Sequence, residues 1–593
     1  MPDSPSIPAT GWDGLPKRKP QALLVQVAKD RHGLRPAATP LTGYSRTPRT
    51  RYPKKRLALI GILITAFVAL LCLFAISARS SDHLRRQASQ SSSIWDNLLF
   101  QEEDVDTEIE ATLPEPDIVP YPQQRQHGSG PLSHKLEHSL AELCSSSQAN
   151  TSITAKYNSK RGFLRRSLLY AGSGNDLRKV LQRARMLSET WLSSQASQGG
   201  DAAKAFRVMV IGGSVSNCRG VDRGQCWHSH LMRWLSKTFP LGDPQDKTQV
   251  SYRFIDLAKS ATGSTFFSYC WQSELVLRKK QTPYLWGEGP DLIIVETGIN
   301  DVVSPNDFVD TATGQSYARD FESLLWQLKS LPSRPAVVVL DAASKLLEKL
   351  QGFNQAAEFT THLAASVWMD VPVISAKSAL MTAAASEELS EAEDLYLADA
   401  HHPNARGHEV LADLLVAHLE SVACQTADMP ETAPSHHTLP QRSFSAPLTD
   451  SPKSLSPSTE QCIQVGVGGE RRKPRRNRGW SRLATSRDKQ YMASSSIGSR
   501  IVYDVIVGEG GQVLLSWLKS RFYNLGDAKV LLDNQKPGVR ISGHWDLGWS
   551  IGVPTVLFEN VSPGPHTVTI EHVKPVKALY SGTNFRLIAV ATT

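Results

Sequence analysis

The middle of the chain alternates between short apolar runs and amphipathic stretches. From about residue 207, five runs of almost unbroken hydrophobic residues are separated by stretches with helical spacing. Strands that are apolar on both faces are typical of a parallel sheet covered by helices on both sides. We therefore predict an α/β domain over residues 204–424, closed by a helix from Asn404 to Cys424. The predicted strands are FRVMVIGG, YRFIDLA, PDLIIVE, AVVVLDA and VPVISA.

The pattern changes to a period of two in the last part of the chain. Between Gln425 and Glu460 six prolines stand among Ser, Thr and His, which predicts an extended linker over 425–460. Beyond the linker, seven short runs alternate apolar and polar residues, with turn residues between them. Strands of this length and spacing predict an all-β sandwich over 461–593. The runs are IVYDVIV, QVLLSWL, AKVLLD, GVRISG, TVLFENV, HTVTIEHV and FRLIAVA.

One segment near the N-terminus is apolar enough to cross a membrane. Leu57 to Ala78 runs 22 residues without a charge, a length that spans a bilayer once. Six basic residues closely precede this run and three follow it, so the positive-inside rule places its N-terminal side in the cytoplasm. We expect a single-pass type II membrane protein with a disordered cytoplasmic tail (1–56), a transmembrane helix (57–78) and a largely disordered stem (79–203). Both folded domains would then be lumenal, in the Golgi or secretory pathway, or extracellular.

The overall charge does not indicate a nucleic-acid partner. The chain carries 65 Lys and Arg against 57 Asp and Glu, so the net charge of +8 is small beside the charged side chains that produce it. A lumenal domain would also not meet nucleic acid. The basic run from Arg471 to Arg478 is interpreted as a solvated loop, with contact to an anionic glycan or membrane surface as the alternative.

The cysteines indicate an oxidising compartment. Six of the seven lie on the expected lumenal side, where disulfides persist. Cys218 and Cys226 are close enough in sequence to staple one loop, and none of the cysteines has the spacing of a zinc site. We expect structural disulfides and no metal. Glycosylation triplets at Asn150 and Asn560 fit this topology.

Three short segments carry the chemistry, each at or just beyond the end of a predicted strand. They are Ile211-Gly-Gly-Ser-Val-Ser216, Glu296-Thr-Gly-Ile-Asn-Asp301 and the run from Asp399 to His408, DAHHPNARGH. Open α/β sheets place their sites at the carboxyl ends of the strands. Together the segments supply a serine nucleophile, an amide donor, and a histidine with an acid three residues before it. This is the set that acyl transfer needs.

The order of these motifs resembles the SGNH (GDSL-like) hydrolase superfamily over residues 207–424. The four blocks are Gly-Gly-Ser, the glycine of Ala-Thr-Gly-Ser, Gly-x-Asn-Asp and Asp-x-x-His-Pro. The resemblance implies a flavodoxin-like α/β/α sandwich with a five-stranded parallel sheet. It also implies Ser214 as nucleophile, Asp399 and His402 as the rest of a triad, and an oxyanion hole made by the N–H groups of Ser214 and Gly263 with the amide of Asn300. No cofactor is implied.

Several neighbouring residues receive other interpretations. Gly213 stands where many members of the superfamily have Asp, and His401 is an alternative base, although the offset from Asp399 favours His402. Asp301 is expected to stabilise its own loop. His401, His402, His408, His418 and Glu409 form no compact ligand set, and Trp227, Trp234 and Trp326 are expected to pack in the core.

The function expected from the resemblance is removal of O-acyl (acetyl) groups from a polysaccharide or glycoconjugate. An O-acyltransferase with the same triad and an inactive, anchored glycan-binding protein are the alternatives. The combination of an anchor, an SGNH-like domain and a β-sandwich resembles membrane-anchored SGNH-domain proteins of algae and fungi, which suggests a carbohydrate partner. Candidates for a sugar-stacking face on the β domain are Trp517, Tyr523, Trp545 and Trp549.

Overall fold

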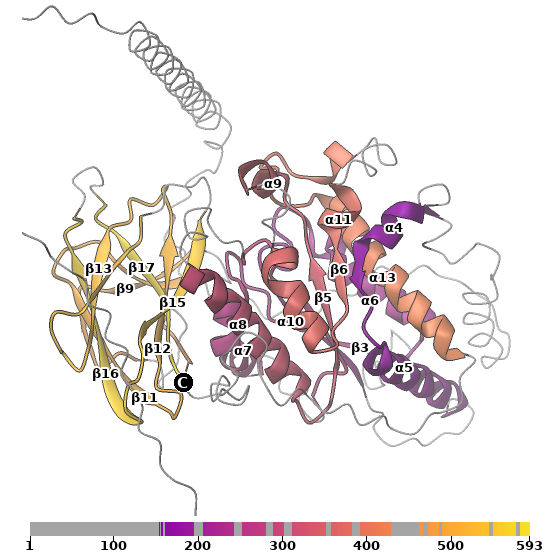
Figure 1. Ribbon diagram of the computed structural model, residues 1–593, viewed down its shortest axis with the longest axis horizontal. Coiled ribbons are helices and arrows are strands. Elements are labelled where there is room, and N and C mark those ends of the chain that lie inside the picture. The colour runs from indigo at the N-terminus through magenta and orange to yellow at the C-terminus, as the bar shows by residue number, and fades with distance from the viewer. Residues whose placement is uncertain are drawn as a thin grey trace, which may run out of the picture. The chain divides into compact units, whose positions relative to one another are not determined.

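The computed structural model describes much of the chain beyond residue 152 (Figure 1). The expected tail, the apolar run 57–78 and the first part of the expected stem lie outside the described residues. Among the described residues, no helix has both the length and the apolar character needed to span a membrane. The described residues are 153, 156–157, 161–194, 205–241, 252–279, 289–301, 311–351, 357–381, 392–427, 462–465, 473–485, 489–544, 550–576 and 582–593.

A six-stranded sheet forms the centre of the first domain, in the order β1-β6-β5-β4-β2-β3. The strands β2 to β6 are the five that the sequence predicted, and they pair in parallel. Their order is that of a flavodoxin-like fold, whose topological switch point lies between β2 and β4. The bounds are β2 (Phe206–Gly212), β3 (Tyr252–Asp256), β4 (Leu292–Glu296), β5 (Ala336–Asp341) and β6 (Val373–Ser375).

The predicted count of five strands is one too low. A sixth strand, β1 (Leu168–Tyr170), lies at the edge of the sheet and pairs antiparallel with β6. It has only three residues, all half-buried. A run this short has no periodicity that could distinguish a strand from a loop.

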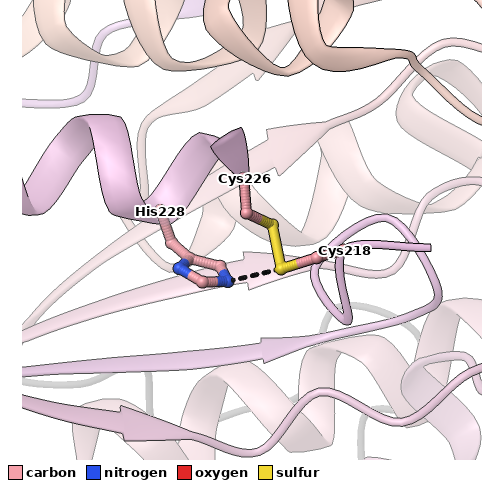
Figure 2. A group of neighbouring side chains, drawn as sticks. All are labelled: Cys218, Cys226 and His228. Atoms are coloured by element: carbon pink, nitrogen blue, oxygen red, sulfur yellow. Dashed lines mark hydrogen bonds between the residues drawn. A yellow bond between two sulfur atoms is a disulfide. The ribbon is translucent and has the colours of Figure 1, made fainter. Parts of the chain in front are cut away.

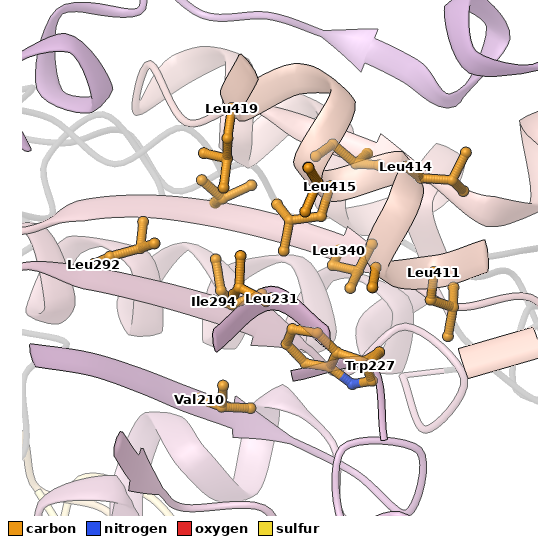
Figure 3. Packing of buried hydrophobic residues seen from close by; sticks show 14 of the residues in the cluster. Val210, Trp227, Leu231, Leu292, Ile294, Leu340, Leu411, Leu414, Leu415 and Leu419 are labelled. Carbon is orange, nitrogen blue, oxygen red and sulfur yellow. The ribbon is translucent and has the colours of Figure 1, made fainter. Parts of the chain in front are cut away.

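Helices cover both faces of the sheet, which gives the predicted three-layer sandwich (Figure 1). On one face α5, α6 and α13 pack over the strands, with Trp227, Leu231 and Leu415 buried against Ile294 (Figure 3). On the other face lie α7, α8 and α10. The bounds are α5 (Asn175–Ser194), α6 (Trp227–Thr238), α7 (Ser264–Lys279), α8 (Thr311–Lys329), α10 (Leu363–Trp368) and α13 (Ala405–Ala427), with the shorter α4 (Arg161–Ser167), α9 (Lys345–Gln351), α11 (Ala376–Leu380), η1 (Arg223–Gln225), η4 (Glu358–His362) and η5 (Ala392–Leu395).

The α/β domain begins earlier than residue 204. The elements α4, β1 and α5 all lie in the segment expected to be stem. Helix α5 buries Leu177, Leu181 and Ala184 in the same apolar cluster as α6 and α13. Its many charged residues follow the opposite face, so the segment reads as polar when its composition is taken without the helical period.

The second domain is a sandwich of two antiparallel sheets, as the period of two predicted. One sheet has the order β15-β12-β17-β10-β9, with β7 paired to β17, and the other has the order β14-β13-β16-β11-β8. Trp517 is buried and donates from Nε1 to the carbonyl of Ser542, so it belongs to the core and not to a sugar-stacking face. Trp545 and Trp549 lie outside the described residues. The strands are β7 (Cys462–Gln464), β8 (Arg476–Arg478), β9 (Ser481–Ala484), β10 (Gln490–Ser494), β11 (Arg500–Val507), β12 (Val513–Lys519), β13 (Asp527–Leu532), β14 (Val539–Ser542), β15 (Ile551–Phe558), β16 (Gly564–Val573) and β17 (Phe585–Thr592).

The two domains share an apolar cluster and a covalent link. Phe267 of α7 and Leu514 of β12 lie in the same buried cluster. A disulfide joins Cys270 of α7 to Cys462 of β7 across 192 positions of sequence. Helix α7 therefore packs against the sheet of its own domain and against the β-sandwich.

Candidate active site

The candidate nucleophile lies directly after the first parallel strand. Strand β2 ends at Gly212, and a tight turn follows in which the N–H of Arg219 donates to the carbonyl of Ser214. Ser214 is only 4% exposed. Its Oγ lies 2.8 Å from Nε2 of His402, which comes from the loop before α13. The structure thus brings together two residues that are 188 positions apart in the chain.

Asp399 holds this histidine on its other side. The distance from Asp399 Oδ2 to His402 Nδ1 is 2.6 Å. The Oδ1 atom accepts from the backbone N–H groups of His401 and His402, both at 2.9 Å. Burial alone would raise the pKa of Asp399. The hydrogen bond and charge of His402 outweigh this effect, so the pKa of Asp399 lies below its ordinary value.

The protonation of His402 suits a general base. Burial lowers its pKa below the ordinary value, and the nearby charges of Arg219 and Lys489 act in the same direction, although Asp399 opposes them. The ring is therefore neutral at pH 7. With the Nδ1 proton directed at Asp399, Nε2 is left to accept from the Ser214 hydroxyl.

The amide of Asn300 faces the same turn from the end of β4. Asn300 is 7% exposed, and its Nδ2 has no hydrogen-bond partner among the described residues. The amide nitrogen lies where a Cβ on Gly213 would be, and a Cβ on Gly263 would overlap the carboxylate of Asp301. The two glycines therefore allow the loops after β2 and β3 to approach the loop after β4. All three residues predicted for the oxyanion hole lie on these loops.

His401, the alternative base, belongs to a different pair. Its Nδ1 lies 2.8 Å from Oγ of Ser344, the residue that precedes α9. Burial lowers the pKa of His401 to about 3, and its ring stands nearly perpendicular to that of His402 at 4.6 Å. The hydroxyl of Ser344 also accepts from the N–H of Leu347 at the start of α9. The pair of Ser344 and His401 therefore stabilises the start of α9.

The turn that carries Ser214 is closed by the predicted disulfide between Cys218 and Cys226 (Figure 2). His228 Nε2 lies 3.1 Å from Sγ of Cys218. These three side chains form the only group in the described part of the chain close enough to share a metal ion. Because the two sulfur atoms are bonded to each other, they do not offer the thiolates that a zinc ion would need.

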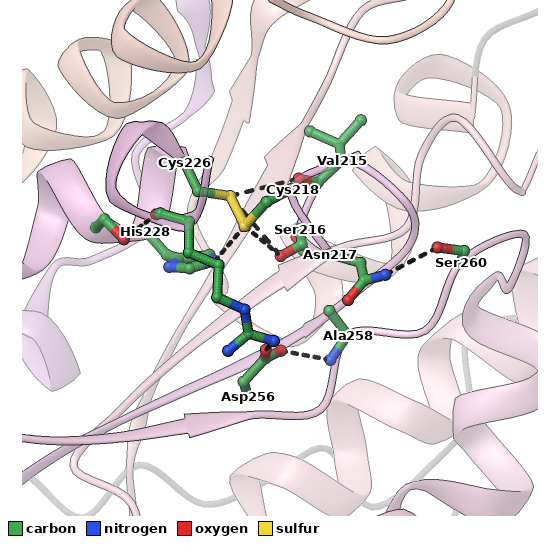
Figure 4. Close-up of polar contacts among 11 residues, drawn as sticks. Val215, Ser216, Asn217, Cys218, Cys226, His228, Asp256, Ala258 and Ser260 are labelled. Atoms are coloured by element: carbon green, nitrogen blue, oxygen red, sulfur yellow. Dashed lines mark hydrogen bonds and ion pairs between the residues drawn. A yellow bond between two sulfur atoms is a disulfide. The ribbon is translucent and has the colours of Figure 1, made fainter. Parts of the chain in front are cut away.

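A second contact fixes the turn from the opposite side. Asn217 donates from Nδ2 to Oγ of Ser260 at 3.1 Å, and the N–H of Ala258 donates to Asp256 at the end of β3 (Figure 4). The same loop touches the β domain, because the N–H of Gly552 in β15 donates to the carbonyl of Ala261 at 2.8 Å. The loop before Gly263 is thus held by both domains.

Two buried ionisable groups near the site were not assigned from the sequence. Glu296 ends β4 and accepts from both the N–H and the hydroxyl of Ser216, and burial raises its pKa to about 8. Glu296 is the first residue of the motif Glu296-Thr-Gly-Ile-Asn-Asp301, but nothing in the sequence indicated its role. His362 lies on η4 and contacts Asp301 and Asp341. No motif or spacing in the sequence points to His362.

Comparison with solved structures shows a shared fold. No protein-family profile and no curated protein matches the sequence. The structure of a two-domain esterase active on acetylated mannans is similar, with a TM-score of 0.51 at 18% identity over 72% of this chain and 99% of that one. The same esterase with mannopentaose gives 0.49 at 17% identity over 72% and 98%, and an acetyl xylan esterase gives 0.25 at 14% over 36% and 98%.

The match to the first of these esterase structures covers 72% of this chain, which is more than either domain alone contains. It therefore supports the pairing of an α/β domain with a β-sandwich as well as the fold of the α/β domain. In fold this protein resembles a two-domain esterase active on acetylated mannans, and the order of its motif residues along the chain resembles that of the SGNH (GDSL-like) hydrolases.

Proposed function

We propose that this protein is a serine ester hydrolase of SGNH type that removes O-acyl groups, acetyl among them, from a polysaccharide or glycoconjugate. The observation that carries the proposal is the hydrogen-bonded series Ser214, His402 and Asp399, with the amide of Asn300 beside it. The carbohydrate part rests on the fold shared with an esterase active on acetylated mannans. The membrane anchor and lumenal location remain part of the proposal, on the charge pattern around residues 57–78.

The reaction follows from these contacts. His402 Nε2 takes the proton of Ser214 as Oγ attacks the acyl carbonyl carbon, and the carbonyl oxygen becomes an oxyanion. The Asn300 amide and the N–H groups of Ser214 and Gly263 would donate to that oxygen. Collapse of the tetrahedral intermediate breaks the ester bond, and the imidazolium gives its proton to the departing sugar oxygen, which leaves as a hydroxyl. Water then attacks the acyl-serine with His402 again as base, which releases the acid and frees Ser214.

Labelling with a fluorophosphonate tests the nucleophile without knowledge of the substrate. We expect mass spectrometry of the labelled protein to find the adduct on Ser214 alone, because among the described residues only this buried hydroxyl has both a histidine base and a carboxylate behind it. The exposed series Ser562, His566 and Asp533 differs, because Ser562 Oγ lies 3.5 Å from His566 Nε2 and that nitrogen lies 2.8 Å from the carbonyl of Ser562. Ser344→Ala is the matched control, since it removes another buried serine–histidine pair, whose histidine is the neighbour of His402. Labelling that persists in Ser214→Ala and disappears in Ser344→Ala would overturn the assignment, and the lack of any adduct would favour an inactive glycan-binding protein.

An O-acyltransferase is the second candidate. Ser214 is 4% and His402 5% exposed, and an acyl-serine so shielded from water can be attacked by a sugar hydroxyl instead. Loading the enzyme with an activated acetyl ester and following the acetyl group separates the reactions. A hydrolase releases acetate at the same rate with and without added oligosaccharide, whereas a transferase releases little acetate and forms an acetylated sugar.

A further inference from the structure

A histidine is held between two carboxylates beneath the candidate site. His362 is completely buried on η4, with its ring stacked on Phe321 of α8 at 3.8 Å between centroids and 11° between planes. Its Nδ1 lies 2.8 Å from Oδ1 of Asp341, and its Nε2 lies 2.9 Å from Oδ2 of Asp301. Both ring nitrogens therefore face an acceptor.

This geometry favours an imidazolium. A neutral imidazole donates from one nitrogen only, so one carboxylate would face a lone pair, whereas the protonated ring donates to both. Burial alone would lower the pKa of His362, but the charges and hydrogen bonds of Asp341 and Asp301 outweigh it and raise the pKa to about 10. The group is thus a cation between two anions, away from water.

Both carboxylates lie against the loops that carry the candidate oxyanion donors. Asp301 follows Asn300 directly, and its Oδ1 accepts at 2.7 Å from the N–H of Ser264, the neighbour of Gly263. Asp341 ends β5, where its Oδ1 would lie 2.5 Å from a Cβ on Gly298 in the loop of Asn300. A rigid charged group thus connects the ends of β4 and β5 with the start of α7.

We propose that His362 is a positioning residue, which through Asp301 and Asp341 holds the Asn300 amide and the Gly263 N–H in the geometry that binds the oxyanion. This inference rests on the proposed esterase function. It assigns His362 no contact with the substrate and no proton transfer. Its action is to fix two donors on separate loops, and a misplacement of such groups by about 1 Å can reduce the rate on the order of a hundredfold.

The test uses His362→Gln, which replaces the cation with a neutral amide of similar reach. We expect kcat on a small acetyl ester to fall about tenfold to a hundredfold with KM within about twofold, because the donors act chiefly in the transition state. Binding of a boronic acid that mimics the tetrahedral intermediate should weaken in parallel. The matched control is His418→Gln, another buried histidine, which lies on α13 with burial alone lowering its pKa.

A double mutant separates positioning from general loss of stability. In an Asn300→Ala background, His362→Gln should reduce kcat by much less than in the wild type, because the donor that it positions is already absent. A merely structural effect would multiply the two losses. Should His362→Gln fail to fold, Asp301→Asn carries the same test, since it keeps the shape and removes one of the charges that hold the proton on His362.

The outcomes are distinct. Wild-type kcat in His362→Gln, a loss shared with His418→Gln, or strict additivity with Asn300→Ala would overturn the positioning role. Failure of the esterase proposal would show earlier, as a wild-type protein in which Ser214 takes no fluorophosphonate. A reduced kcat, weaker boronic acid binding and non-additivity together would support the inference.

Discussion

The side-chain amide of Asn300 occupies the space that a Cβ on residue 213 would need, so Gly213 is the only residue type that leaves this amide in place. Asn300 and Gly213 follow neighbouring parallel strands, β4 and β2, on either side of the switch point. Many SGNH hydrolases have Asp at the position of Gly213, but here the close approach of the Asn300 amide leaves no room for a side chain.

Gly213→Ala should therefore displace the Asn300 amide. We expect a loss of kcat on the order of a hundredfold, similar to Asn300→Ala, because each change removes one oxyanion donor. Steady-state kinetics on a small acetyl ester would measure it. The matched control is Gly224→Ala, where a Cβ meets nothing within 4 Å. Unchanged kcat in Gly213→Ala would show that Asn300 does not act on the oxyanion.

Substitution of the two adjacent histidines, His401 and His402, should have very different effects on kcat. His402→Gln should lower kcat by about a thousandfold or more, since it removes the base that contacts Ser214. His401→Gln should have an effect below about tenfold, because His401 pairs with Ser344 at the start of α9. Similar losses in the two purified variants would contradict the assignment of the base.

The pH dependence of kcat/KM should report His402. The base must be neutral, so activity is lost as pH falls through its pKa, which lies below the ordinary value of about 6.5. Arg219→Gln removes a charge that lowers this pKa, so it should move the acid limb to higher pH. Arg233→Gln on α6 is the control. An acid limb above pH 6.5 in the wild type would be inconsistent with this site.

Stability should decrease on the alkaline side in a way that depends on His362. Its folded pKa of about 10 lies above the unfolded value, so its contribution is complete below about pH 6.5 and is lost as pH rises toward 10. The charged groups around it are Asp301, Asp341 and Glu358. Burial raises the pKa of Glu358 from 4.5 to about 7, so the loss of stability that Glu358 causes falls between these values and is complete before most of the His362 loss. Urea unfolding between pH 6 and 10 should show a weaker alkaline decrease in His362→Gln than in the wild type.

Proteolysis should test how the domains are joined. We expect the first cleavage between Gln425 and Glu460, a segment rich in proline and serine. The two fragments should remain together on a non-reducing denaturing gel, because the disulfide between Cys270 and Cys462 connects them, and separate once the bond is reduced. In Cys270→Ser they should separate without reductant. Separation of the wild-type fragments on the non-reducing gel would contradict the interdomain bond.

The hydrophobic pattern alone determined the class of both domains. Runs such as the LIIV of residues 292–295 are apolar on both faces, which is typical of a strand covered on two sides. The period of two beyond residue 500 predicts a sandwich. Because parallel strands end at one edge of a sheet, residues after successive strands had to meet there. The meeting of the loops that carry Ser214 and Asn300 was therefore predictable, whereas His402, which precedes α13 and does not follow a strand directly, was assigned through the resemblance of its Asp-x-x-His-Pro motif.

Other features were decided only by the tertiary structure. The edge strand β1 is too short to carry a period, and helix α5 is recognised through its contacts with α6 and α13. The pairing of Cys270 with Cys462 depends on how two domains dock, which no local pattern encodes. His362 stands 61 positions from Asp301 and 21 from Asp341, with nothing around it in sequence to mark it. The charge of His362 can hold the two carboxylates together only after folding has buried all three groups, because in water each of them would be separately solvated.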